Sequence, residues 1–220
     1  MRLDARYDLA MVEKRCRILP FCAAVALSWF AMQAHAAQVL DVHVMRDGER
    51  FVIGMRFGID APPPAVFRAL QDYSAMMRYN PDLRAVRVHP TGIPGRVRLF
   101  TAVHTCVLIF CKTMDQNEIM TAIANSDGGV LESELLPGGG DFKAGSARWS
   151  VGSCRTARWM TCVDARIELV PAFWVPPVIG AWVLRRKMAE EARLTGTGLE
   201  LVAQGAKAQA GNAQASLEDH

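Results

Sequence analysis

Hydrophobic and polar residues alternate along much of the chain between residues 39 and 171. In the segment 51–59 every second residue is large and apolar: Phe51, Ile53, Met55, Phe57 and Ile59. A period of two with one solid apolar face predicts a half-buried strand. The segment 39–45 is a second strand candidate, and Asp47-Gly48 between the two segments is a strong hairpin signal.

A helical spacing of apolar residues follows this hairpin. Pro62, Pro63 and Pro64 stop the second strand and open a helix, because proline suits the first helical turn. Asn80-Pro81 ends the region, which is long enough for two short helices. Apolar side chains recur through it at helical spacing, at Val66, Phe67, Leu70, Tyr73 and Met77.

Strand patterns return between residues 83 and 171. They are separated by a turn at 125–129 and a wide glycine loop at 137–140. Repeated meanders of this kind predict an antiparallel sheet with one dry and one wet face. The expected strands cover 96–104, a less regular stretch from 112 to about 124, 130–136, the region around 147–151, and 163–169.

The C-terminal part of the sheet region leads into an apolar run over 172–184, followed by Arg185, Arg186 and Lys187. Thirteen apolar residues are too few to span a bilayer, so we expect a long helix packed on the sheet. Thr195–Gly198 is expected to interrupt this helix before a last turn to about Gln204. Residues 205–220 contain no apolar anchor and are expected to form a disordered tail.

Residues 1–36 have the pattern of a signal peptide. Basic residues precede the apolar run Ile18–Met32, and the segment ends in Ala34-His35-Ala36, which suits cleavage between Ala36 and Ala37. A retained N-terminal anchor is the minority alternative, because the run is shorter than the ~20 residues of a membrane-spanning helix. We therefore expect a signal peptide (1–36), a folded domain (37–204) and a tail (205–220), in a protein exported to the periplasm.

The net charge changes the list of plausible partners. It is +3 over 220 residues, and removal of residues 1–36 leaves a nearly neutral chain. Such a balance does not favour a nucleic-acid partner, which would need a basic surface. We expect a partner chosen by shape and hydrophobicity instead.

Four cysteines remain after residue 36: Cys106, Cys111, Cys154 and Cys162. An even number in an exported chain predicts disulfides. A hairpin would bring Cys154 and Cys162 together. Cys106 and Cys111 can pair only if 107–110 is a turn, because five extended residues would separate their Cα atoms by roughly 16 Å, against ~6 Å in a disulfide.

Two other interpretations of the cysteines remain open. One is free buried thiols. The other is a metal site built from His104, Cys106 and Cys111, which lacks the usual zinc spacing and a convincing fourth ligand. We expect the disulfides Cys106–Cys111 and Cys154–Cys162, no metal and no cofactor.

The order of elements is that of an α+β helix-grip fold, in which a curved antiparallel sheet wraps around a long C-terminal helix. Residues 59–73 together with Asn80-Pro81 resemble the N-terminal signature of START-like proteins of the SRPBCC (polyketide cyclase/dehydrase) group, which includes coenzyme Q-binding START domains. Residues 173–180 resemble the C-terminal signature of an exported branch. The resemblance covers about residues 39–203 and implies an apolar cavity for a lipid, sterol, quinone or polyketide.

Aromatic and sulfur-containing side chains on the segments that border this family's cavity are the candidate ligand contacts. Each of them is individually more often part of a plain core. The apolar stretch Val107, Leu108, Ile109 and Phe110 is expected at a hairpin tip, where polar residues are usual, so it suggests a gate over the pocket or a contact with a membrane or partner. The candidate contacts are Tyr73, Met76, Met77, Tyr79, Phe100, Trp149, Trp174 and Trp182.

Catalytic candidates are weaker, because the sequence contains no nucleophile elbow, phosphate loop or zinc-protease motif. Glu132 and Glu134 share one strand face, and in an apolar cavity they would have raised pKa values suited to acid–base work. A solvated outer face is the commoner outcome for such a pair. Asp141 and Arg148 would polarise a carbonyl at a cavity mouth or pair with each other on the surface.

Three functions are compatible with these sequence features. The leading one is an exported, non-enzymatic carrier or chaperone of a hydrophobic small molecule, with transient membrane contact. The second is an enzyme of the polyketide cyclase type, which an inward-facing carboxylate pair would favour. The third is a cell-envelope protein-interaction module with a filled pocket, which a cavity below ~300 Å³ would favour.

Overall fold

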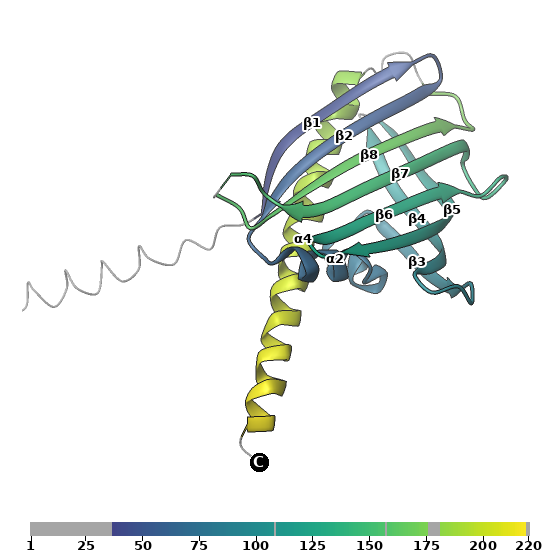
Figure 1. Cartoon of the computed structure of the whole chain (residues 1–220). Coiled ribbons are helices and arrows are strands. Elements are labelled where there is room, and N and C mark those ends of the chain that lie inside the picture. The colour runs from purple at the N-terminus through teal and green to yellow at the C-terminus, as the bar shows by residue number, and fades with distance from the viewer. Residues whose placement is uncertain (1–36, 108, 157, 176–180, 219–220) are drawn as a thin grey trace, which may run out of the picture. The chain divides into compact units, whose positions relative to one another are not determined.

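The computed structural model describes residues 37–107, 109–156, 158–175 and 181–218. The expectations for residues 1–36, including Ala36, and for Leu108 lie outside the described residues. The elements, shown in Figure 1, are β1 (Gln38–Asp47), β2 (Arg50–Ile59), α2 (Pro63–Leu70), η2 (Tyr73–Ala75), α3 (Met76–Tyr79), β3 (Leu83–Pro90), β4 (Arg96–Val107), β5 (Phe110–Asn125), β6 (Gly128–Leu135), β7 (Phe142–Ser153), β8 (Thr161–Pro171) and α4 (Ala181–Glu218).

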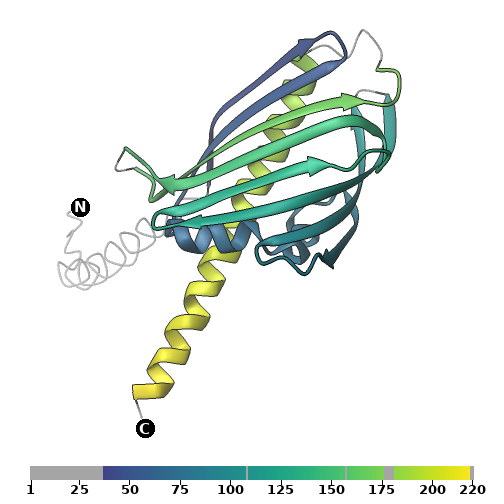
Figure 2. The same ribbon diagram turned by 45° about the vertical axis from the view of Figure 1, so that its right-hand side comes forward.

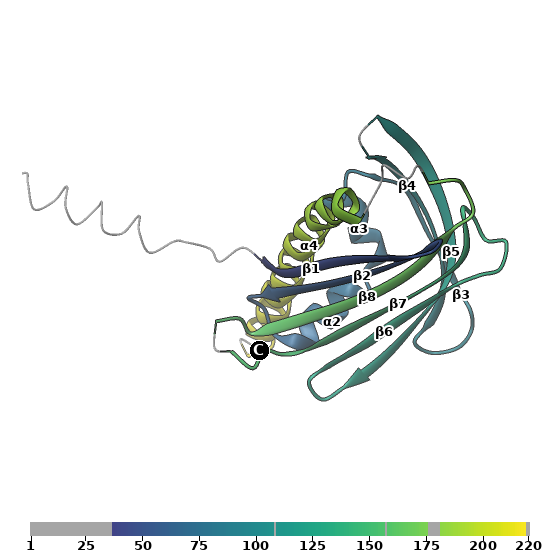
Figure 3. The ribbon, with the colours of Figure 1, turned by 90° about the horizontal axis from the view of Figure 1, so that it is seen from above.

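The strands form one sheet in the order β1-β2-β8-β7-β6-β5-β4-β3. Every neighbouring pair is antiparallel, and the β2–β8 pairing joins the N-terminal hairpin to the last strand of the meander. Seen from above, the sheet curves, and α3 and α4 lie on its concave side (Figure 3). Figure 2 shows α4 crossing the sheet diagonally and continuing beyond it. This arrangement confirms the predicted helix-grip architecture.

The core lies between the concave face of the sheet and the helices. Alternate strand residues point into it, so that Phe57, Leu99, Leu131 and Val163 are almost fully buried, and Leu199 meets them from α4. The N-terminal hairpin, the helix that opens at the prolines and the strands β4 to β8 occur where the alternation predicts them, whereas the edge strand β3 was not among the expected strands.

Strand β2 is buried on both faces, although its alternation predicted one wet face. Two of its outward residues are glycines that lie beneath rings: a Cβ at Gly54 would be 2.0 Å from the His43 imidazole, and one at Gly58 would be 2.4 Å from the Trp159 indole. Glycine at these two positions therefore lets the rings pack directly against the strand backbone, a common reason for glycine within a strand.

Helix α4 corrects two expectations. It runs without interruption through Thr195–Gly198, because Leu199 is buried next to this segment and packing outweighs the low helix propensity of glycine. The helix also continues to Glu218, where a disordered tail was expected. Residues 206–218 include five alanines and two glutamines, which extend a helix that is already nucleated upstream.

Both expected disulfides are present. Cys106 and Cys111 face each other in the β4–β5 ladder with a Cα–Cα distance of 4.0 Å, and Val107–Phe110 is the last pair before the turn. The Cα atoms of Cys154 and Cys162 are 4.8 Å apart. Although His104 lies close to the first bridge, its two sulfur atoms are bonded to each other and are not thiolate ligands.

Among the described residues, no helix has the length and apolar character needed to cross a bilayer.

Candidate functional site

A cavity of about 250 Å³ lies between the concave face of the sheet, the segment α2–α3 and α4. Its walls are mostly apolar. The lining residues are Leu70, Tyr73, Met76 and Asn80 from the helical segment, Leu99 from β4, Gln116, Glu118 and Met120 from β5, Leu131, Ser133 and Leu135 from β6, Ser146, Ala147 and Trp149 from β7, Ile167 and Leu169 from β8, and Thr195 from α4.

The cavity exists because two small inward residues are neighbours at the centre of the sheet. Ser133 of β6 pairs with Ala147 of β7. The next inward pair along these strands is Leu131 with Trp149, so larger side chains flank the small ones. A curved sheet with a small central pair leaves space beneath the helix that the surrounding side chains do not fill.

A single carboxyl group, that of Glu118, borders this cavity among apolar residues. Burial raises the pKa of Glu118, and a hydrogen bond with the Ser133 hydroxyl opposes that shift. Burial together with the nearby Glu118 charge raises the pKa of Tyr73 to about 12. Glu118, Ser133 and Tyr73 therefore supply hydrogen-bonding groups in the wall of a mostly apolar space.

A polar network closes the cavity beside Asn80. Asn80 Nδ2 donates a hydrogen bond to Glu191 Oε2 at 3.0 Å. Lys187 Nζ lies 3.0 Å from Glu191 Oε1 and 2.8 Å from Asp82 Oδ2, and all three charged side chains are largely buried. Although burial works in the opposite direction, the two carboxylates raise the pKa of Lys187. The network fixes α4 to the chain between α3 and β3.

Three of the eight predicted ligand contacts line the cavity: Tyr73, Met76 and Trp149. The Trp149 ring also packs against Phe57, with centroids 6.1 Å apart. These residues lie where the helical segment and the inward face of β7 border the space.

Four of the other five lie elsewhere. Met77 is 46% exposed because it follows Met76 on a helical turn and points away. Phe100 alternates with buried Leu99 and lies under the Arg87 guanidinium, 5.1 Å from its ring centre. Trp174 and Trp182 are 74% and 72% exposed. The side chain of Tyr79 lies outside the described residues.

The most informative cavity residue, Glu118, was missed by the sequence analysis. Gln116, Glu118 and Met120 occupy consecutive inward positions of β5. Two polar residues on the dry face made the pattern from 112 to 124 look irregular. That irregularity was the available signal, because a polar residue on an inward position needs a partner or a function.

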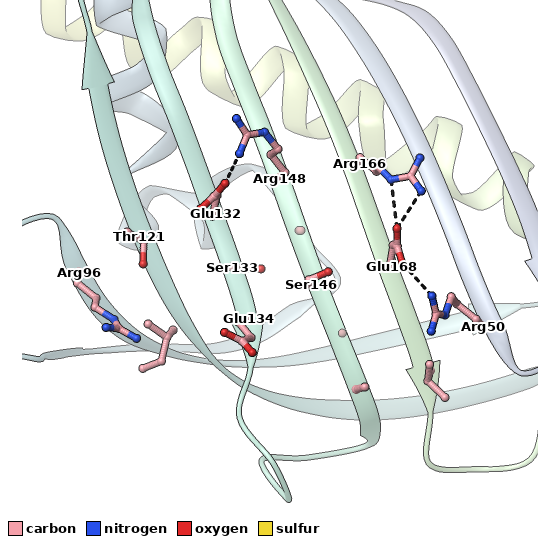
Figure 4. Close-up of a pocket in the computed structure, with 15 residues that line it drawn as sticks. Arg50, Arg96, Thr121, Glu132, Ser133, Glu134, Ser146, Arg148, Arg166 and Glu168 are labelled. Atoms are coloured by element: carbon pink, nitrogen blue, oxygen red, sulfur yellow. Dashed lines mark hydrogen bonds and ion pairs between the residues drawn. The ribbon is translucent and has the colours of Figure 1, made fainter.

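The catalytic candidates Glu132, Glu134 and Arg148 lie on the outer, convex face of the sheet, opposite the cavity (Figure 4). Their neighbours Leu131 and Ser133 point inward, so alternation sends the carboxylates outward. Glu132 pairs with Arg148. The carboxylate pair therefore lies on the outer face, the outcome that the sequence analysis favoured, and not among the residues that line the cavity.

The outer face contains a larger hollow, of about 580 Å³. Five of its charged side chains pair with one another: besides the Glu132–Arg148 pair, Glu168 binds Arg166 at 2.9 Å and Arg50 at 3.4 Å (Figure 4). Exposed ion pairs of this kind are weak and strongly hydrated. The more apolar cavity on the concave face is the better candidate for an apolar ligand.

Asp141 is a structural anchor rather than a cavity residue. Its carboxylate accepts a hydrogen bond from the Asp115 backbone N–H at 2.9 Å and binds Lys112 Nζ at 2.9 Å. These two contacts hold the pKa of Asp141 below its usual value. The contacts tie the β6–β7 loop to β5.

The expected gate at 107–110 is the tip of the β4–β5 hairpin. Ile109 is 88% exposed, whereas the side chains of Val107 and Phe110 lie outside the described residues. Gln116, the cavity residue of β5 nearest to the tip, is five residues beyond Cys111, or roughly 16 Å along a strand. Ile109, the tip residue whose side chain is described, is not among the described residues that line the cavity, and the gate stays a prediction.

No protein-family model and no curated protein matches this sequence. Solved structures do resemble the fold. The human StarD13 (DLC2) lipid transfer and protein localization domain aligns with 12% identity and a TM-score of 0.55, covering 83% of this chain and 96% of that one. This chain has the START-like fold.

Two further START-like structures show the same architecture. The STAR-related lipid transfer protein from Xanthomonas axonopodis has 15% identity and a TM-score of 0.52, with 74% of this chain and 98% of that one covered. The di-domain ARO/CYC protein BexL has 14% identity and a TM-score of 0.51, over 71% of this chain and 51% of that one. At these identities the likeness concerns the fold, and function has to be argued from the cavity.

Proposed function

We propose that this START-like protein binds a small hydrophobic molecule in the cavity under α4 and acts as its carrier or chaperone in the periplasm. The observation that carries this proposal is a partly open, mostly apolar cavity with one carboxyl group, that of Glu118, in its wall. Pockets of this kind, with few convergent polar groups, are the usual sites for apolar ligands.

The volume limits the ligand. About 250 Å³ lies below the ~300 Å³ at which typical ligand pockets begin, which on size alone favours a filled interaction module. However, an engineered cavity of about 150 Å³ already binds benzene. The space suits one ring system or a short acyl segment, with the rest of a longer molecule outside.

The hydrogen-bonding groups in the cavity wall favour a ligand that carries a hydrogen-bonding oxygen. With a raised pKa, the Glu118 carboxyl is protonated over a wider pH range and then donates a hydrogen bond to a carbonyl or hydroxyl oxygen. A quinone or a fatty alcohol has this combination of an apolar body and a terminal oxygen. An entirely apolar ligand would leave the carboxyl without a ligand partner.

Glu118 also supports a second candidate, an acid–base catalyst of the polyketide cyclase type. A desolvated carboxyl beside a tyrosine hydroxyl is a chemically suitable proton donor and acceptor. Under this alternative, Glu118→Gln abolishes turnover of a bound ketone, whereas in a carrier the same variant changes only affinity.

Two disulfides support the proposed export, because such bridges persist in oxidising compartments. The leader-like pattern of residues 1–36 and a periplasmic destination belong to the same proposal. Neither disulfide borders the cavity, so they stabilise the scaffold rather than contact the ligand.

The experiment that tests binding is native mass spectrometry of protein purified from the periplasm, with its organic extract analysed in parallel. We expect one small hydrophobic molecule bound per chain. Ala147→Leu fills the centre of the cavity and should lower occupancy at least about tenfold, since the ligand loses most of its buried apolar contact.

Ser150→Leu is the matched control, because Ser150 lies on the same strand but pairs with the outward residues Val130 and Asp164. It should leave occupancy unchanged. Equal occupancy in the Ala147→Leu protein, or a bare chain even after incubation with membrane extract, would contradict binding in this cavity.

A further inference from the structure

Ala37, the residue expected to follow the signal-peptidase cut, is part of the folded core. It is 8% exposed. It lies against α4 at Gly196, where an added methyl group would be 3.4 Å from the Ala37 Cβ. Its backbone N–H donates a hydrogen bond to Glu200 Oε2. A residue that only joins a leader to a domain would be expected on the surface.

Glu200 is a buried acceptor with a fixed orientation. Its side chain is 5% exposed and lies among Leu199 and Ala203, which are also buried. Its second oxygen accepts a hydrogen bond from Gln204 Nε2 at 3.2 Å, and Gln204 Nε2 in turn lies 3.4 Å from the Asp60 carbonyl oxygen. A buried carboxylate is rarely found without such partners.

We propose that Glu200 is the binding site for the new N-terminus that export creates. Water adds across the Ala36–Ala37 peptide bond under the action of a signal peptidase: the Ala36 carbonyl becomes a carboxylate, and the Ala37 nitrogen leaves as an α-ammonium group. That ammonium then takes the place of the amide N–H against Glu200 Oε2. The proposal rests on the export proposed above and is independent of ligand binding.

The exchange strengthens an existing contact. Before cleavage a neutral amide donates one hydrogen bond to a carboxylate, and after cleavage a cation with three donors faces the same oxygen. The amide–carboxylate bond is already charge-assisted, and cleavage adds the Coulombic attraction between an ammonium and a carboxylate, which is larger where water is excluded. A buried pair benefits when both partners are well hydrogen-bonded. Cleavage thus locks the start of β1 to α4 and couples processing to the final stability of the domain.

The test compares one protein before and after a cut. The chain is exported with a specific protease site placed directly before Ala37, so that the uncut form carries an amide and the cut form a free amine at the same atom. We expect cutting to raise the folding equilibrium constant in urea by at least about tenfold, the range of a hydrogen bond to a charged group. In the Glu200→Gln protein the gain should be less than about twofold.

Glu190→Gln is the matched control, since Glu190 lies on the same helix with its side chain 59% exposed. It should respond to the cut like the unaltered protein. An equal gain in the Glu200→Gln protein, or no gain in the unaltered one, would overturn the proposal.

A second measurement needs no variant and covers the case in which Glu200→Gln fails to fold. N-terminal sequencing of the exported full-length chain should begin at Ala37. Acetic anhydride should then acetylate the Ala37 amine at least about tenfold more slowly in the native protein than in urea, because an ion-paired, buried amine is shielded. A different N-terminus, or equal acetylation rates, would refute the proposed ion pair.

Discussion

Single residues decide where the ligand space is and how polar it becomes. Ser133 and Ala147 are small enough to leave the centre of the concave face open. Glu118 then places a carboxyl group against that space, and burial raises its pKa. A desolvated carboxyl group lowers the stability of the folded domain, and groups with perturbed pKa values cluster at functional sites. We therefore choose Glu118 as the cavity residue with which to test function.

Glu118→Gln should reveal this destabilisation through its pH dependence. Because the pKa of Glu118 is raised in the folded state, the folded protein binds more protons than the unfolded one above the ordinary glutamate pKa of 4.5. Unfolding free energy is therefore lost as the pH rises from 4.5 through the folded pKa. Urea titrations between about pH 4 and pH 8 should show the Glu118→Gln protein gaining stability over the unaltered protein as the pH increases.

Glu134→Gln, on the exposed outer face, is the matched control for the loss of one carboxylate. A constant difference between the Glu118→Gln protein and the unaltered protein across the pH range would mean that Glu118 is not desolvated in the folded state.

Gly58 is a second residue whose size is dictated by a neighbour. A Cβ there would lie 2.4 Å from the buried Trp159 indole, so Gly58→Ala should lower the unfolding free energy by about 1–3 kcal/mol through overpacking. In Gly54→Ala the new methyl group meets the His43 ring, which is exposed and can rotate toward solvent. This variant should therefore lose less unfolding free energy than Gly58→Ala. Chemical denaturation of both variants measures the difference, and equal losses would contradict this account.

At the scale of elements, α4 shows how packing overrides local propensity. The Thr-Gly repeat at 195–198 predicts a break, yet the helix is continuous because its inward residues, including Leu199 and Ala203, are buried against the sheet and α2. Gly196 faces Ala37 and Phe57 at ordinary contact distances for an added methyl group. The glycine is therefore tolerated by the helix and is not needed for close approach.

Gly196→Ala should accordingly stabilise the protein by about 0.5–1 kcal/mol, since alanine has the higher helix propensity and the methyl group fits. Gly205→Ala, where nothing lies within 4 Å, isolates the propensity effect and should give a similar gain. Thermal unfolding of the two variants checks this. A loss of stability in Gly196→Ala alone would show that the helix packs more tightly on Ala37 than described.

At the scale of the whole molecule, exposed apolar residues lie on several elements, two of them near the β4–β5 tip. Phe173 lies under Lys112 Nζ at 5.0 Å, and Lys112 directly follows Cys111, so neighbouring Trp174 lies near the β4–β5 tip that carries Ile109. Exposed Trp182, on α4, lies one helical turn before Arg186. The transient membrane contact expected from the sequence stays a prediction, and tryptophan beside arginine, a combination typical of membrane interfaces, makes Trp182 the residue with which to test it.

Trp182→Ser should reduce binding to vesicles of phosphatidylglycerol and phosphatidylethanolamine by at least about tenfold, because a buried aromatic side chain is lost from the interface. Leu201→Ser, which removes another exposed apolar residue of α4, should have little effect. Co-sedimentation measures both. Unchanged binding of the Trp182→Ser protein would place the contact elsewhere or exclude it.

The sequence by itself determined the N-terminal hairpin, most strands of the meander and the helix-grip order of elements, because these follow from local periodicity and turn residues. It favoured the two disulfide pairs without excluding free thiols or a metal site, and it did not predict the edge strand β3. It also identified Tyr73, Met76 and Trp149 as cavity residues. Only the tertiary structure decided that Glu132 and Glu134 face outward while Glu118 faces the cavity, that α4 remains unbroken at Gly196, and that Ala37 meets Glu200. A period of two separates the faces of a strand, but sheet curvature and cross-strand register decide which face becomes the inside and which distant residues meet there.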